Sequence, residues 1–311
     1  MENKSEIVFV LKGLNETQMT RQIYFAFALI IYLFTIFVNL TLIVTIFLEK
    51  VLHEPMYIFL CNLCFNGIYG ASSFYPKLLH DLLADAHVIS YAGCITQIFV
   101  VYSYVFCEFT NLTVMAYDRY VAICKPLQYR SIMTAQKVGR LLLLTWSFSL
   151  FETAVGVALT GRLPLCGVHV DKLFCTNWAV VKLSCSDTTL NNVYGFLLTL
   201  SHLSQTALIL LSYVHIVKAS LRSRADRRKF TQTCLPHLIT LANFTVSLVF
   251  DVMYSRYGGG GGGGLQALRN VLAAEFLVVP PLVNPIIYGM NLQQIRSRLA
   301  QTFSHKVHAL R

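Results

Sequence analysis

Residues 23–48 read IYFAFALIIYLFTIFVNLTLIVTIFL, and this apolar run without a charged side chain decides the fold class of the chain. A bilayer core about 30 Å thick is crossed by about 20 consecutive apolar residues in a helix, so the run is long enough to span it. It is too long for the apolar part of a signal peptide and has no small-residue cleavage site. We therefore expect it to remain in the protein as a first membrane span.

Six further apolar stretches along the chain are candidates for additional spans. Only 13% of the 311 residues are charged and 55% are hydrophobic, whereas soluble domains contain about 25% charged residues. Several stretches carry polar residues, so hydropathy alone allows about five to eight spans, and seven fits the charge distribution best. The expected fold is an all-α membrane protein, a bundle of seven transmembrane helices with approximate spans 23–48, 56–80, 91–118, 138–160, 191–217, 233–254 and 266–288.

The net charge of +10 is distributed unevenly over the segments between these spans. Counted together with the adjoining ends of the spans and with the N-terminus outside, the cytoplasmic segments contain sixteen Lys and Arg, against eight in the N-terminus and external loops. Basic residues concentrate on the cytoplasmic side of membrane proteins. We therefore expect an extracellular N-terminus, a cytoplasmic C-terminus, and contact with membrane lipid but not with nucleic acid.

The segments outside the spans carry further signals. The N-terminal segment 1–22 contains short glycosylation patterns at Asn3 and Asn15, which fit an extracellular position. We interpret the glycine run 258–264 as a flexible tether between the sixth and seventh spans. In the cytoplasmic segment 289–311, apolar and basic residues at near-helical spacing predict a short amphipathic helix along the inner membrane surface.

The nine cysteines fall into two groups by their position relative to the spans. Five of them lie in spans or on the inner side. Among these, Cys61 and Cys64 have the C-x-x-C spacing of a redox or metal motif, but we interpret them as buried thiols of a membrane helix. We therefore expect no metal site and no cofactor. The other four lie in an oxidising compartment, at the start of the third span and in the long external loop 161–190: Cys94, Cys166, Cys175 and Cys185. Four cysteines allow three disulfide pairings, and the sequence does not choose among them.

Adjacent opposite charges mark the cytoplasmic end of the third span, within the stretch MAYDRYVAICKPLQY at 115–129. Asp118 and Arg119 can pair with each other and with neighbouring helices, so they can latch one of two helix arrangements. An ordinary surface ion pair contributes only about 0–1 kcal/mol. A D-R-Y tripeptide by itself is therefore weak support for such a role.

A proline-containing sequence in the seventh span, N-P-I-I-Y at 284–288, is the second informative motif. Pro285 removes one backbone hydrogen bond and kinks the helix. We expect the neighbouring Asn284 to satisfy the freed carbonyl and to face the bundle interior, as polar residues in lipid do. Such a hinge suits a helix that must move.

With these motifs the chain resembles a rhodopsin-like G-protein-coupled receptor, and longer strings are similar to those of the odorant (olfactory) receptor family. The similarity extends over roughly residues 20–300. It implies a non-enzymatic plasma-membrane receptor for olfaction, which binds a small odorant and activates a heterotrimeric G protein, expected to be the olfactory stimulatory type that raises cAMP. The strings that carry the resemblance are D-R-Y at 118–120, Trp146 in the fourth span, N-P-x-x-Y at 284–288, M-A-Y-D-R-Y-V-A-I-C at 115–124, L-H-E-P-M-Y at 52–57, L-S-C-S-D-T at 183–188 and S-Y at 212–213.

The resemblance also implies roles for particular residues. Bonds Cys94–Cys175 and Cys166–Cys185 would hold the long loop over the outer mouth, with odorants beneath it among spans three, five, six and seven. Arg119 would face the G protein in the active state. The implied activation switch consists of Asp118, Arg119, Tyr120, Tyr213, Asn284, Pro285 and Tyr288. The implied pocket residues are Ile98, Val101, Tyr102, Val105, Phe106, Ser201, His202, Leu248, Val252, Asn270 and Ala274.

The chain departs from the family pattern at several positions where activation details would apply. Gly67 stands in the second span where the family usually has an acid, which weakens the case for a sodium site, although Glu108 remains as a buried acid in the third span. In the sixth span, Thr245 replaces a common tyrosine, and Pro236 beside His237 replaces a small residue.

Other functions fit the sequence less well. The pocket residues are mostly apolar with a few hydrogen-bonding groups, as in small-molecule sites. No acid lies on the outer half of the third-span stripe, so we do not expect an amine anchored there by an ion pair. A receptor of the same class for a non-odorant small molecule, a lipid or a peptide is the nearer alternative. A transporter is more remote, because the sequence shows no internal repeat of the kind that transporters carry.

Overall fold

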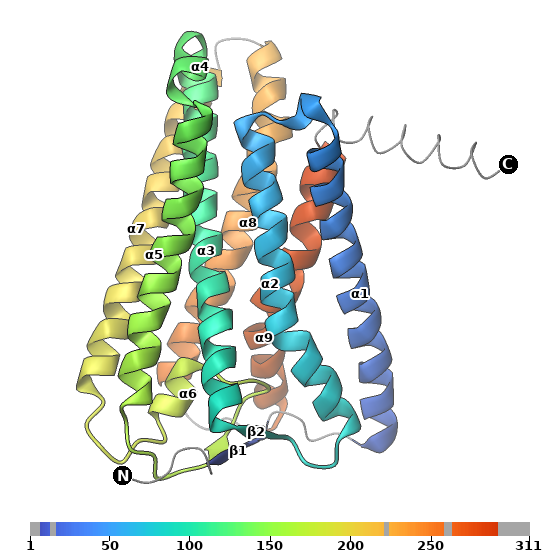
Figure 1. The fold of residues 1–311 in the computed structure, drawn as a ribbon, viewed down its shortest axis with the longest axis vertical. Coiled ribbons are helices and arrows are strands. Elements are labelled where there is room, and N and C mark those ends of the chain that lie inside the picture. Colours follow the sequence, from blue (N-terminus) through green and yellow to red (C-terminus); the bar gives the residue numbers. More distant parts are fainter. Residues whose placement is uncertain (1–6, 13–16, 221–223, 258–262, 292–311) are drawn as a thin grey trace, which may run out of the picture.

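In the computed structural model, residues 7–12, 17–220, 224–257 and 263–291 are described, and they form an elongated bundle of long helices (Figure 1). Within this part of the chain seven helices are long, which confirms the expected bundle. They are α1 (Gln18–Leu48), α2 (Pro55–Leu83), α3 (Tyr91–Cys124), α5 (Ala135–Gly161), α7 (Thr189–Ser220), α8 (Arg224–Tyr257) and α9 (Gly263–Asn291). The connections contain the short helices η2 (Lys50–Leu52), η3 (Pro126–Gln128), α4 (Tyr129–Ile132) and α6 (Asn177–Val181).

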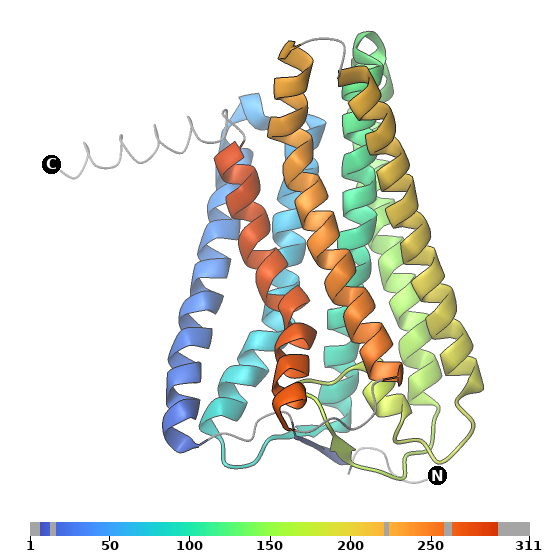
Figure 2. The ribbon, with the colours of Figure 1, turned by 180° about the vertical axis from the view of Figure 1, so that it is seen from behind.

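Length and composition allow four of the described helices to cross a membrane by themselves, namely α1, α3, α5 and α7. Helices α8 and α9, which lie in front in Figure 2, contain shorter apolar segments, His237–Met253 and Ala274–Tyr288. Of the apolar window of α3, 78% is buried inside the protein, against 22% in α1 and 17% in α7. Helix α3 is therefore the centre of the bundle, whereas α1 and α7 direct apolar side chains outward, as helices that face lipid do.

Local sequence explains where several helices begin. Thr17, Ser90 and Thr134 precede α1, α3 and α5, and each side-chain oxygen accepts a hydrogen bond from the backbone N–H three residues later. Such N-caps satisfy an N–H that has no partner within the helix. Pro55 is the first residue of α2, where its missing N–H removes no helical hydrogen bond.

Some expectations about the loops and tails differ from the structure or fall outside it. Helix α9 begins at Gly263, so the last two glycines of the run 258–264 are helical instead of forming part of a tether. Once a helix is nucleated, each added residue contributes a hydrogen bond, which allows it to extend into glycines. The rest of the run, the expected amphipathic tail helix, and Asn3 and Asn15 lie outside the described residues.

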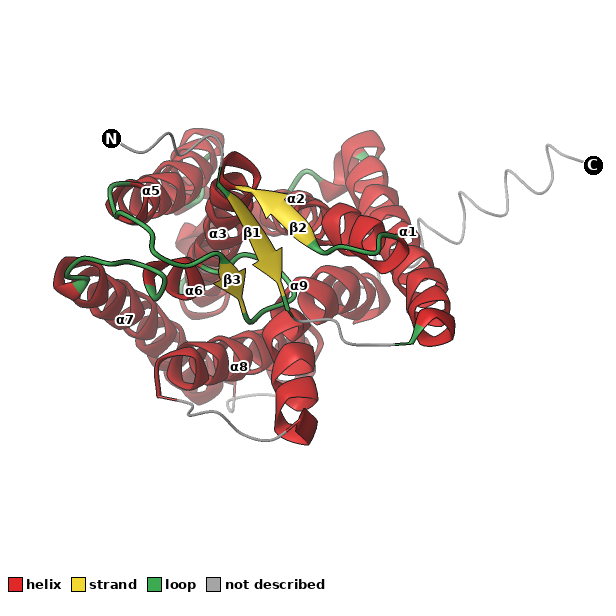
Figure 3. Ribbon diagram, turned by 90° about the horizontal axis from the view of Figure 1, so that it is seen from below, coloured by secondary structure: helices red, strands yellow, loops and turns green. Residues whose placement is uncertain are grey.

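A small sheet, which the all-α expectation does not include, covers one end of the bundle (Figure 3). Strand β1 (Val8–Leu11) lies between β2 (Val88–Ser90), which is antiparallel to it, and β3 (His169–Val170), which is parallel. Phe9 and Leu11 of β1 are buried against Cys94 and Cys175. The N-terminal strand thus closes what we call the Cys94 end of the bundle, and the opposite end is called the Arg119 end.

Three prolines lie within α9, and for two of them another helix supplies the hydrogen bond that the proline removes. Pro285 cannot donate to the carbonyl of Pro281, which instead accepts from Nδ2 of Asn39 at 2.7 Å. Pro280 cannot donate to the carbonyl of Phe276, which accepts from the hydroxyl of Tyr104 at 2.9 Å. Because a carbonyl without a partner is costly in an apolar interior, these bonds fix α9 against α1 and α3.

The expectation that Asn284 satisfies the carbonyl freed by Pro285 is therefore wrong. Asn284 is buried, but its Nδ2 donates to Glu108 at 2.9 Å and its Oδ1 accepts from Thr240 at 3.0 Å. The carbonyl is instead satisfied by a side chain far away in the sequence, which the local motif does not reveal.

Candidate functional site

The long loop between α5 and α7 forms a roof over the Cys94 end. Disulfides Cys94–Cys175 and Cys166–Cys185 hold it, and these are the pairs that the resemblance implies. The backbone N–H of Cys175 donates to Oε1 of Gln97 in α3 at 2.9 Å. Helix α6 of the same loop packs against α5 and α8. The roof is therefore tied to the bundle by covalent and hydrogen bonds.

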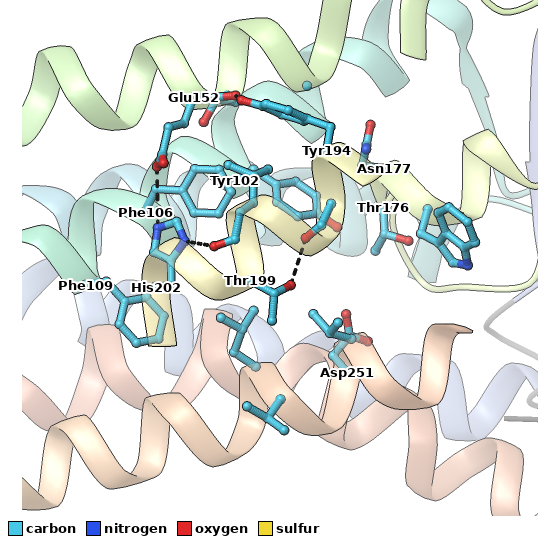
Figure 4. A pocket seen from close by; sticks show the side chains of 18 of the residues that line it. Tyr102, Phe106, Phe109, Glu152, Thr176, Asn177, Tyr194, Thr199, His202 and Asp251 are labelled. Atoms are coloured by element: carbon cyan, nitrogen blue, oxygen red, sulfur yellow. Dashed lines mark hydrogen bonds and ion pairs between the residues drawn. The ribbon is translucent and has the colours of Figure 1, made fainter. Parts of the chain in front are cut away.

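Beneath this roof lies a cavity of about 200 Å³ (Figure 4). Residues of α3, α5, α7 and α8 form its walls, and residues of α6, which belongs to the roof, line it as well. The side chains facing it are mostly apolar or aromatic, with a few hydrogen-bonding and charged groups among them. Small-molecule sites have this composition.

Six of the expected pocket residues line the cavity, and these are Ile98, Tyr102, Phe106, His202, Leu248 and Val252. Ile98, Tyr102 and Phe106 follow one another at four-residue intervals and therefore share one face of α3. The other expected residues of α3, Val101 and Val105, do not line the cavity but belong to the central hydrophobic core. The expected stripe on α3 was therefore too wide.

Two further expected pocket residues have other surroundings, and a third lies outside the described side chains. Ser201 does not line the cavity and donates its hydroxyl to Glu152 at 3.2 Å. Ala274 is buried in the central core, and the side chain of Asn270 lies outside the described part of the chain.

Of the α9 residues whose side chains the structure describes, 274–288, none lines the cavity. The side chains of 263–273 lie outside the described part of the chain, so the expected contribution of the seventh span stays a prediction. Aromatic rings link the described part of α9 to α3, α8 and the roof. The ring of Phe276 in α9 lies 6.4 Å from the rings of both Phe174 and Phe244, and Phe244 lies 6.1 Å from Tyr104. The fourth span, α5, lines the cavity as well, which was not expected.

Several charged lining residues were missed by the sequence analysis, notably Glu152 of α5, with Asp251 and Arg256 of α8. Glu152 could have been predicted from the sequence, because a charged residue within a membrane span usually faces the bundle interior and marks a functional site. Thr245, named above only as a departure from the family pattern, also lines the cavity.

Most charges at the outer part of the cavity are paired within the protein. Nζ of Lys172 in the roof lies 2.8 Å from Oδ1 of Asp251, and both side chains are largely buried. The Arg256 guanidinium lies over the ring of Trp178 at 4.4 Å and over that of Phe196 at 4.5 Å. Cation–π contacts of this kind stabilise a guanidinium in apolar surroundings.

Deeper in the cavity, Glu152 and His202 face each other (Figure 4). The distance from Oε2 of Glu152 to Nε2 of His202 is 3.6 Å. Nδ1 of His202 lies 2.8 Å from the carbonyl oxygen of Leu198 in the preceding helical turn. The ring of Phe106 stacks on the imidazole with centroids 4.4 Å apart. These contacts fix the orientation of the imidazole toward the carboxylate.

At the Arg119 end, the expected switch residues form two groups. Arg119 donates from Nε to Oδ2 of Asp118 at 3.0 Å, and the hydroxyl of Tyr129 in α4 donates to Oδ1 of Asp118 at 2.7 Å. Burial, and then the charge of Asp118, raises the pKa of Tyr129, so this phenol remains a donor at neutral pH. The ring of Tyr120 is directed elsewhere, toward His215, at 6.2 Å between centroids.

The second group joins α3, α7, α8 and α9. The Tyr213 hydroxyl lies 2.7 Å from Nδ1 of His237, whose Nε2 lies 3.0 Å from the carbonyl oxygen of Leu112. Tyr288 is buried in the adjoining core. In this arrangement Tyr213 is engaged with the sixth span.

Asn284, another of the expected switch residues, is bonded to a buried acid in the middle of the bundle. Glu108 accepts from Asn66 at 2.8 Å and from Asn284 at 2.9 Å, one bond on each carboxylate oxygen. Gly67 lies against Asn39 and Pro281, so α2 approaches α9 closely where the family usually has an acid. Among the described residues, no group of three or more acidic, histidine or cysteine side chains could hold a metal ion.

Comparisons with known proteins agree with this architecture. The family model described as "Olfactory receptor" matches residues 27–306. Similar proteins include olfactory receptor 2C1 of Mus musculus, 33% identical over 303 residues that cover 96% of both chains. Olfactory receptor 11A1 of Homo sapiens is 36% identical over 302 residues, which cover 96% of this chain and 94% of that receptor. Olfactory receptor 1N1 of Homo sapiens is 35% identical and covers 98% of both chains.

The fold also matches a solved membrane receptor. The crystal structure of squid rhodopsin superimposes with a TM-score of 0.74, covering 96% of this chain and 89% of that chain at 15% identity. At that identity the match shows the seven-helix fold and no shared ligand. The sequence comparisons carry the family assignment, because they extend over nearly the whole chain. This chain belongs to the olfactory receptor family, a family of signalling receptors and not of enzymes, built on the rhodopsin-like seven-helix fold.

Proposed function

We propose that this chain is an odorant receptor that binds a small, largely apolar molecule in the cavity and activates a heterotrimeric G protein of the stimulatory type, which raises cAMP. The observation that carries the proposal is the position of α3. One end of this helix lines the cavity through Ile98, Tyr102 and Phe106, and its other end carries Asp118 and Arg119. A single rigid element therefore touches both the ligand site and the expected G-protein site.

The cavity restricts the size of the ligand. Its volume of about 200 Å³ is below the roughly 300–1,000 Å³ of sites for drug-sized ligands. One disulfide ties the roof to α3 and a second cross-links the roof itself, so a large peptide would have to displace a braced loop. A compact molecule with an apolar body fits better than a lipid or a peptide.

We infer that the Arg119 end works as a two-state element. In the arrangement seen here, Asp118 holds Arg119, while Tyr213 is bonded to His237. In the active state Arg119 would leave Asp118 and pack beneath the G protein near Tyr213 and Tyr288. A ligand shifts such an equilibrium only by the difference between its binding energies for the two states, and the coupling between the two sites is reciprocal.

The experiment replaces Arg119 by alanine and measures odorant-driven cAMP in transfected cells, using a diverse odorant panel. Arg119→Ala should abolish the cAMP response while surface expression and odorant binding are retained. Arg130→Ala is the matched control, because Arg130 lies at the same end but is exposed. Normal signalling by Arg119→Ala at the surface would contradict the mechanism. Agonist uptake that persists without any G protein would indicate a transporter.

We further propose that the N-terminus lies outside the plasma membrane and the C-terminus inside. The distribution of basic residues supports this orientation, as does the position of both disulfides at the Cys94 end, where β1 also lies. Epitope tags at both ends, stained on intact and permeabilised cells, test it. A C-terminal tag that is visible on intact cells would contradict the proposed orientation.

A further inference from the structure

A carboxylate in the wall of the cavity has hydrogen-bonding capacity that the protein leaves unused. Glu152 lies in the middle of α5 and is 8% exposed. Its Oε1 accepts from the Ser201 hydroxyl, whereas its Oε2 has no hydrogen-bond partner among the described residues. Burying an ionised carboxylate is costly unless other groups compensate its charge. A ligand that supplies a donor, and especially a positive charge, would therefore gain from contact with Oε2.

The group that faces Oε2 is itself an acceptor. Nδ1 of His202 lies 2.8 Å from the carbonyl oxygen of Leu198, which can only accept, so Nδ1 carries a proton. In the neutral imidazole Nε2 then presents a lone pair, and it too has no hydrogen-bond partner in the described part of the chain. Nε2 of His202 lies 3.6 Å from Oε2 of Glu152, which is too far for a direct hydrogen bond.

The other charges of the cavity do not compensate Glu152. Lys172 is paired with Asp251, and Arg256 is held over two aromatic rings. Among the ion pairs of the described residues, Glu152 has none with a lysine or an arginine. The carboxylate is therefore the point in the cavity wall where an added positive charge is most favoured.

We propose that Glu152 and His202 form the recognition site for the ammonium group of a small primary amine with an apolar body, an inference that rests on the ligand-binding role proposed above. A primary ammonium has several N–H donors on one nitrogen, so it can donate to Oε2 and to Nε2 together. An amine of the lysine type has a pKa near 10.4 and is charged at neutral pH. The acid comes from the fourth span, so the absence of an acid on the third-span stripe does not exclude this ligand.

The surroundings of the pair suit such a ligand. The ring of Phe106 stacks on His202, and the ring of Phe109 lies 5.3 Å from it, edge to face. Aromatic faces attract cations in addition to providing apolar contact. Leu248 and Val252 of α8 line the cavity as well, and they provide the apolar surface that an alkyl or aryl tail requires.

The test measures binding directly on the purified full-length receptor, with hexylamine and 1-hexanol as probes that share one carbon chain. Wild type should bind hexylamine at least about tenfold more tightly than 1-hexanol. Glu152→Gln should weaken hexylamine about 10- to 100-fold, as expected for the loss of a hydrogen bond to a charged group, and should weaken 1-hexanol much less, because the amide oxygen of Gln still accepts from a hydroxyl. His202→Phe should weaken hexylamine less, because the carboxylate remains.

The matched control removes the other carboxylate of the cavity together with its partner, in the double variant Lys172→Gln/Asp251→Asn. This variant should retain the preference for hexylamine. Equal affinity of wild type for both probes would overturn the proposal even if Glu152→Gln fails to fold. An equal loss of both probes in Glu152→Gln would also overturn it, because that result indicates a purely structural role.

Signalling separates this inference from the proposed function. If hexylamine binds in a Glu152-dependent manner but no G protein is recruited, the recognition site stands and the proposed signalling fails. If 1-hexanol raises cAMP and hexylamine does not bind, the receptor function stands and the amine site is wrong.

Discussion

Replacing Gly70 by alanine tests the close packing between α2 and α3. A Cβ built on Gly70 would lie 2.7 Å from Cε2 of Tyr104 and closer still to Cδ2. Carbon atoms pack favourably at about 3.5–4.0 Å, so the ring would have to move by about 1 Å. Tyr104 is fully buried and its hydroxyl donates to the Phe276 carbonyl. Moving the ring therefore also disturbs a hydrogen bond that holds α9.

The expected loss of stability follows from three contributions. Overpacking a buried site costs about 1–3 kcal/mol. Losing a hydrogen bond between membrane helices costs about 0.6 kcal/mol on average and up to about 1.7. Alanine in place of a helical glycine regains about 1 kcal/mol. We therefore expect Gly70→Ala to destabilise the receptor by about 1–4 kcal/mol.

The assay is thermal unfolding of the purified receptor, with surface expression as a second measurement. Gly139→Ala is the matched control, because Gly139 is exposed in α5 and no atom lies within 4 Å of its added Cβ. The control should be neutral or stabilising by up to about 1 kcal/mol. In the double variant Gly70→Ala/Tyr104→Leu, the smaller leucine should restore part of the stability that Gly70→Ala removes. If Gly70→Ala is as stable as Gly139→Ala, the packing argument is wrong.

Three further predictions concern the connecting segments. Cys175→Ala should lose surface expression, because its disulfide closes a separation of 81 residues and such bonds stabilise by about 2–4 kcal/mol, whereas Cys107→Ala should be expressed normally. Tyr129→Phe removes a donor to Asp118 and should raise ligand-independent cAMP by about tenfold, since hydrogen bonds to charged groups contribute about 1.5–3 kcal/mol. Asp187→Ala should lower the unfolding temperature at pH 7. Hydrogen bonds hold the pKa of this carboxyl below its usual range, so the difference from wild type should disappear as pH falls through that pKa.

The candidate site could be predicted in part, and the errors have a common cause. The four-residue spacing of Ile98, Tyr102 and Phe106 places them on one face of α3, and this face does line the cavity. Which neighbouring residues share the site depends on the rotation of the helix about its axis. Val101 precedes Tyr102 by one residue, so its side chain is rotated from that of Tyr102 by about a quarter to a third of a turn around the helix axis. This rotation directs Val101 into the core instead of the cavity.

The rotation of each helix is set by contacts between residues that are distant in the sequence. The ring of Phe276 in α9 packs against that of Phe244 in α8, and α5 contributes Glu152 to the cavity wall. The packing of Phe276 against Phe244 has no local signal in the motifs. Glu152 had the clearest usable signal, because a lone acid in a span is expected to face the interior.

The amino-acid sequence by itself determined the class, the number of spans and the family of this protein. Long runs without charge are stable in the bilayer core, because every backbone group is satisfied within the helix and most side chains are apolar. The tertiary structure alone decided the partners of the polar groups, including Asn39 for the Pro281 carbonyl and His202 opposite Glu152. The position of β1 over the Cys94 end was decided in the same way. These pairings depend on how helices rotate and pack, and many arrangements of one set of spans satisfy the same hydropathy.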